Sequence, residues 1–82
     1  MEGKENMKLK AAAQPGRPII TTDARSITAE FAIDDKADMN AQVIEAKALM
    51  YSLLERPGVN YVNGLFRIAG IAETVHMIRL RK

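Results

Sequence analysis

Side chains that could carry out nucleophilic or metal chemistry are few in this chain of 82 residues. There is one histidine, His76, there are two serines, Ser26 and Ser52, and there is no cysteine. Nucleophilic catalysis needs a base beside the nucleophile and a third group that orients the base. First-row metals usually take two or three His or Cys ligands. We therefore expect no catalytic residue and no metal site.

Glycines and carboxylates are not arranged as a site either. A phosphate-binding loop needs closely spaced glycines before a helix, whereas the five glycines stand at positions 3, 16, 58, 64 and 70. The densest carboxylate cluster is Asp34, Asp35 and Asp38, which lies where a helix should begin and is typical of helix capping. We expect no enzyme, no cofactor and no small-molecule substrate.

Charge is distributed unevenly along the chain, although the formal net charge is only +2. Residues 1–25 contain five basic and three acidic side chains, and residues 26–56 contain three basic and six acidic ones. Residues 57–82 contain four basic side chains and one acidic. The near-neutral total therefore conceals a basic start, an acidic middle and a basic end.

Three segments have the pattern of regular structure. Apolar residues alternate with others over residues 26–33, which predicts a half-buried strand. Over residues 36–56 they recur at spacings of three and four, which predicts an amphipathic helix that a Pro-Gly pair ends. The run Ile-Ile-Thr-Thr at 19–22 indicates a short edge strand. The predicted core stripe of the helix is Met39, Val43, Ala46, Met50, Leu53 and Leu54.

Two strand pairings remain open after the helix. The Asn63-Gly64 pair is a strong hairpin signal, so residues 59–62 could pair with residues 65–69. Alternatively, residues 59–64 are a connection, and the main hairpin joins residues 65–70 to residues 74–81. We favour the second arrangement because both of its arms are long enough to pair. In either case the order is strand, helix, strand, strand.

The last two strands place three arginines on one surface if alternation with a period of two holds. With Phe66 and Ile78 toward the helix, the side chains of Arg67, Arg79 and Arg81 share the opposite face of the sheet. The predicted partner-binding residues are Tyr61, Arg67, Met77, Arg79 and Arg81. Guanidinium groups bind carboxylates and phosphates, so the partner is an acidic protein surface or a nucleic-acid backbone. The shortage of aromatic residues for base stacking favours a protein.

The first 18 residues differ in composition from the rest. They contain few large apolar groups, and the prolines of the stretch Gln-Pro-Gly-Arg-Pro interrupt a continuous helix. We predict a flexible basic arm over residues 1–18, followed by an α+β domain over residues 19–82. In the nucleic-acid alternative, Lys8, Lys10 and Arg17 of the arm act together with Arg67, Arg79 and Arg81.

A second apolar line on the predicted helix indicates self-association. Ile44, Ala48 and Tyr51 lie roughly 100° around the helix from the first line. One sheet does not need both lines, so we expect the second to contact another copy of the chain or a partner. An open sheet face and an open edge support the same prediction of a homo-oligomer.

The chain has no apolar stretch near the roughly 20 residues that cross a bilayer, and its charged start lacks the apolar region of a secretory signal. We therefore expect a cytoplasmic protein that does not contact membranes.

Together these patterns predict a small α+β domain with one helix, residues 36–56, on an antiparallel sheet in β-α-β-β order, with or without an extra N-terminal edge strand. The layout is similar to that of many small binding modules, including compact regulators encoded by phages and plasmids. The expected function is that of a non-enzymatic, oligomeric interaction protein, an adaptor or inhibitor, which binds a macromolecular partner through the arginines. The alternative is a small nucleic-acid-binding protein that uses the same face and the arm.

Overall fold

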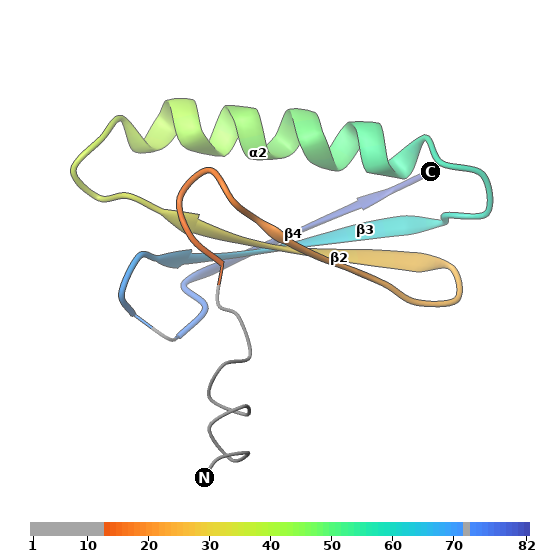
Figure 1. Ribbon diagram of the computed structural model, residues 1–82. Coiled ribbons are helices and arrows are strands. Elements are labelled where there is room, and N and C mark those ends of the chain that lie inside the picture. The colour runs from red at the N-terminus through yellow and green to blue at the C-terminus, as the bar shows by residue number, and fades with distance from the viewer. Residues whose placement is uncertain (1–12, 72) are drawn as a thin grey trace, which may run out of the picture.

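The computed structural model describes residues 13–71 and 73–82, which form one helix and four strands. The elements are β1 (Ile19–Thr22), β2 (Ser26–Ile33), α2 (Met39–Leu54), β3 (Tyr61–Ile68) and β4 (His76–Arg81). The strands form one sheet in the order β1-β2-β3-β4, and α2 lies along one face of it (Figure 1). The predicted α+β class, the strand order and the extra N-terminal edge strand are confirmed.

The sheet is mixed, so the prediction of an antiparallel sheet is wrong for its central pair. β2 and β3 are parallel, with Ser26 opposite Tyr61 and Ile33 opposite Ile68. The cause is α2, which crosses over the sheet and returns the chain to the end at which β2 began. The outer pairs, β1 with β2 and β3 with β4, are antiparallel.

Side-chain hydrogen bonds set the start of α2. Asp38 is the N-cap, and its Oδ1 accepts hydrogen bonds from two backbone N–H groups of the first turn at 3.0 and 3.2 Å. Gln42 holds the preceding loop, since its Nε2 donates to the Asp34 carbonyl and its Oε1 accepts from the Asp34 N–H, both at 2.8 Å. The helix is shorter than the predicted 36–56, because Asp38 caps one end and Glu55 the other.

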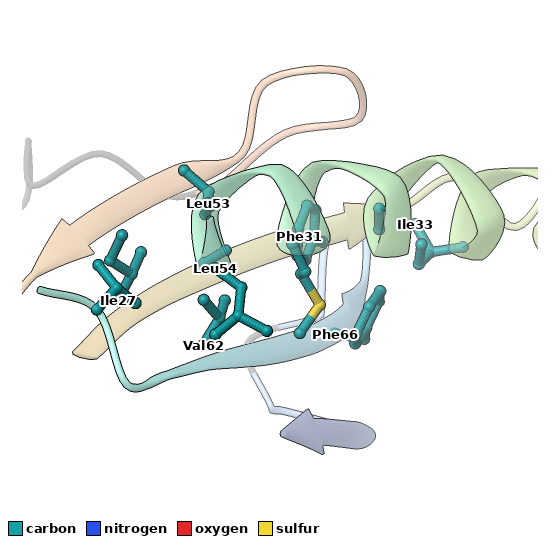
Figure 2. Packing of buried hydrophobic residues seen from close by; sticks show 11 residues of the cluster. Ile27, Phe31, Ile33, Leu53, Leu54, Val62 and Phe66 are labelled. Atoms are coloured by element: carbon teal, nitrogen blue, oxygen red, sulfur yellow. The ribbon is translucent and has the colours of Figure 1, made fainter. Parts of the chain in front are cut away.

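The core lies between α2 and the facing side of β2 and β3. Ile27, Met50 and Val62 are fully buried. The rings of Phe31 and Phe66, on neighbouring strands, stack with their centroids 5.0 Å apart. Figure 2 shows the buried side chains of the two strands gathered with those of the helix in one cluster, which includes Ile27, Phe31, Ile33, Val62 and Phe66 of the strands and Leu53 and Leu54 of the helix.

Gly64 lies inside β3 and not in a turn. Of the two pairings left open, the hairpin of the last two segments occurs, with Leu65 opposite Met77, and the turn at Asn63-Gly64 does not. Its first arm is Tyr61–Ile68 and not the predicted 65–70, so residues 61–64 belong to the strand and not to a connection. A Cβ at Gly64 would lie only 2.5 Å from Sδ and 2.9 Å from Cε of Met50. Glycine occupies this position because the Met50 side chain packs directly on the strand.

The described end of the predicted arm folds against the domain. Gln14 and Arg17 exchange backbone hydrogen bonds at 3.2 and 2.8 Å around a Pro-Gly pair, whose glycine has a φ of 78°. This is the conformation that a type II turn requires of glycine at its third position. Ala13, before the turn, is buried. Residues 13–18 of the predicted arm therefore have defined structure, and residues 1–12 of it lie outside the described residues.

Candidate partner-binding surface

No described helix covers the sheet face turned away from α2, and we call it the open face (Figure 1). Residues paired across neighbouring strands point to the same face, and successive residues of a strand point to opposite faces. On the open face Tyr61 pairs with Arg81, Asn63 with Arg79, and Leu65 with Met77. We use the name arginine face for Tyr61, Asn63, Leu65, Arg67, Met77, Arg79 and Arg81.

The strand register places all five predicted partner-binding residues on this face. Arg79 and Arg81 alternate with Ile78 and Leu80, which pack against the core on the helix side. Arg67 lies on β3, opposite Ala32 of β2. The role of these residues in binding stays a prediction.

Arg79 is held in place by two neighbours on β3. Its Nε donates a hydrogen bond to Oδ1 of Asn63 at 2.7 Å, and its Cζ lies 4.7 Å from the centre of the Tyr61 ring. A guanidinium over an aromatic ring is attracted by the negative face of the ring. Because the Nε–H group is already bonded to Asn63, the N–H groups of the two terminal nitrogens are the ones that can donate to an external acceptor. Sequence reasoning missed Asn63, which it placed either in a turn or in the connection before the favoured hairpin.

The other two arginines differ in their surroundings. Nη2 of Arg67 lies 3.5 Å from Oε1 of Glu30 on β2, so a carboxylate of the domain offsets part of its charge. Arg81 is exposed at the end of β4. Within residues 13–71 and 73–82, neither Arg79 nor Arg81 has a carboxylate partner. On the arginine face, the positive charge that no described carboxylate offsets therefore lies on β4.

Apolar side chains are exposed among these charges. Met77 is 64% exposed, and Val75, just before β4, is 58% exposed. Leu65, opposite Met77, is half-buried. Exposed apolar groups beside arginines match the composition of the centre of a protein–protein interface.

Of the three arm residues of the nucleic-acid alternative, Arg17 lies among the described residues. Lys8 and Lys10 lie outside the described residues. The turn that contains Arg17 borders a groove of about 190 Å³ whose other walls include Phe31 and Glu45, so it lies beside β2 and α2.

Metal ligation, His76 and the helix can each be assessed in the part of the chain that the structure describes. That part contains no group of three or more His, Cys, Asp or Glu that could hold a metal ion. His76 is exposed on the helix side of β4, with its ring centroid 6.1 Å from that of Phe66. The described helix is too short and too polar to cross a membrane.

Comparisons of this chain with protein-family models, curated proteins and solved structures found no match.

Proposed function

We propose that this protein is a non-enzymatic binding module that holds an acidic protein partner on the arginine face. The observation that carries the proposal lies on β4, where Arg79 and Arg81 have no carboxylate partner among the described residues and follow the exposed Met77 along the same face. An acidic partner supplies carboxylates to the two arginines while its apolar groups cover Met77. A protein with such a surface acts as an adaptor or inhibitor.

The same arginines attract phosphates, so nucleic acid is the competing partner. Two features favour a protein. The ring of Tyr61 is covered by the Arg79 guanidinium, and it is therefore not free to stack on a base. A phosphate backbone would also leave Met77 and Val75 in water, whereas a protein surface buries them.

Self-association through α2 is a second part of the proposal. Ile44 and Tyr51 are 68% and 55% exposed, and Ala48 lies exposed between them. Residues at these spacings form one apolar stripe on a helix, here on the side away from the sheet. Contact between two copies along this stripe leaves the arginine face free for the partner.

Affinity capture from cells of the native host tests the proposed partner class. The bait is the full chain, compared with the double variant Arg79→Glu and Arg81→Glu. The matched control is Arg25→Glu with Lys36→Glu, which makes the same change of charge at two exposed positions in the turns before β2 and α2. Proteins retained by wild type and control but lost from the arginine variant support the proposal. Equal capture by all three chains would show that the partner binds elsewhere.

Titration of labelled single- and double-stranded oligonucleotides separates the competing partner. The protein proposal predicts no specific binding at about 50 mM salt, and no difference between wild type and the arginine variant. An affinity that falls steeply between about 50 and about 300 mM salt, and that the arginine variant loses, would replace the protein proposal with nucleic-acid binding.

A further inference from the structure

Among residues 13–71 and 73–82, no strand pairs with the outer edge of β4. The sheet order places β3 on its other side. At the end of the β3–β4 ladder, the Lys82 N–H donates to the Asn60 carbonyl at 3.0 Å. Backbone groups of an antiparallel strand bond inward at every second residue, so the even-numbered residues of β4 bond to β3. The N–H and C=O groups that point outward therefore belong to Met77, Arg79 and Arg81.

The side chains along this edge set the chemistry of an added strand. The residues whose backbone points outward carry their side chains on the arginine face. The residues between them include Ile78 and Leu80, which are partly buried on the helix side. A strand placed beside β4 thus has every second side chain next to Arg79 and Arg81, and the others next to apolar groups.

We infer that the partner binds as an extended segment that adds a fifth strand beside β4. Its acidic side chains occupy alternate positions on the arginine face, and apolar side chains lie between them. The six residues of β4 match a segment of similar length, about 20 Å. The inference rests on the proposed function, because it specifies how the partner occupies the arginine face.

Charge excludes a second copy of β4 as the added strand. β4 has the sequence His-Met-Ile-Arg-Leu-Arg, with no carboxylate. Pairing two copies about a two-fold axis would bring the arginines of both onto one continuous face, and like charges on neighbouring strands are destabilising.

The outer edge of β1 is less suited to an acidic segment. It offers four residues, Ile-Ile-Thr-Thr, with no charged side chain. Its own outward backbone groups belong to Ile20 and Thr22, since the Asp23 N–H bonds inward to the Ser26 carbonyl at 2.9 Å. This edge therefore supplies a matched control.

The experiment uses the full chain and a fluorescein-labelled peptide of four Glu-Val repeats, followed by anisotropy. A peptide of the same composition, with its glutamates in one block and its valines in another, is the sequence control. The inference predicts at least about tenfold tighter binding of the alternating peptide. Met77→Pro removes one outward N–H and keeps both arginines, so it should weaken binding about tenfold, whereas Ile20→Pro on β1 should not.

Amide exchange measured by NMR on the wild-type chain locates the peptide without any substitution. The peptide should slow exchange of the Met77, Arg79 and Arg81 amides by at least about tenfold and leave those of Ile20 and Thr22 unchanged. Absence of binding at about 1 mM peptide, or protection on β1 alone, would overturn the inference.

The two proposals fail in different ways. In one outcome, Met77→Pro does not change peptide binding, but the arginine variant Arg79→Glu with Arg81→Glu loses it. This result would overturn the added strand and leave the arginine face as the binding surface. Conversely, capture from cells that does not depend on these arginines would overturn the proposed function, whatever the peptide does.

Discussion

Replacing Gly64 with alanine should destabilise the domain, although alanine normally suits a strand better than glycine. The lower backbone entropy of unfolded alanine favours folding by roughly 0.5–1 kcal/mol. Here, however, the new Cβ would lie 2.5 Å from Sδ and 2.9 Å from Cε of Met50, and 3.1 Å from Cε1 of Phe66. Met50 is fully buried, so its side chain moves only by displacing core neighbours, and such overpacking costs roughly 1–3 kcal/mol. The expected net loss is about 1 kcal/mol, or about 4–8 °C in Tm.

A double-mutant cycle measures this contact. Urea unfolding followed by circular dichroism compares wild type, Gly64→Ala, Met50→Ala and the double variant. Met50→Ala alone should lose roughly 2–5 kcal/mol by opening a cavity. The Cβ at position 64 fills part of that cavity. The double variant should therefore lose about 1 kcal/mol less unfolding free energy than the two single variants lose together. Additive losses, or a Gly64→Ala protein more stable than wild type, would refute the packing of Met50 on the strand.

Three further predictions concern the helix. Asp38→Ala should lower the unfolding free energy by about 1 kcal/mol because it removes the N-cap oxygen, while Asp35→Ala, an exposed neighbour outside the cap, should melt at the wild-type temperature. Gln42→Ala should lower the unfolding free energy by about 1–2 kcal/mol, because the loop before α2 loses both hydrogen bonds to the side-chain amide. A melting temperature no lower than that of Asp35→Ala would contradict this role. Ile44→Lys with Tyr51→Lys should convert an oligomer to a monomer with little change in Tm, as measured by light scattering, and a wild-type mass of one chain at every concentration would contradict the proposed self-association.

Local patterns were sufficient to predict β2 and the existence of α2. The alternation over residues 26–33 matches the strand residue by residue, because it depends only on neighbours in the chain. The ends of the helix depend on which carboxylate turns back to the backbone, and Asp35 and Asp38 look alike in the sequence. The parallel pairing of β2 with β3 depends on where the helix crosses the sheet, which no hydrophobic pattern within β3 reveals.

The candidate site was predictable only in part. A common face for Arg67, Arg79 and Arg81 follows from the period of a strand. The contacts of Arg79 do not follow from that period, because only the register of β3 with β4 brings Asn63 and Tyr61 beside it. The Asn-Gly turn signal was misleading since packing of the helix on Gly64 overrides local turn preference. Met39, which was assigned to the core stripe, is exposed because it is the first residue of the helix.

Photo-crosslinking in cells of the native host tests the central claim most directly. A photoreactive amino acid replaces Met77 in the middle of the arginine face, and in a second chain it replaces Lys36, an exposed residue in the loop before α2. The proposed function predicts a covalent adduct with another protein from position 77, absent from position 36 and lost when Arg79→Glu and Arg81→Glu are added. Adducts with nucleic acid alone from position 77, or protein adducts that survive the loss of both arginines, would contradict it.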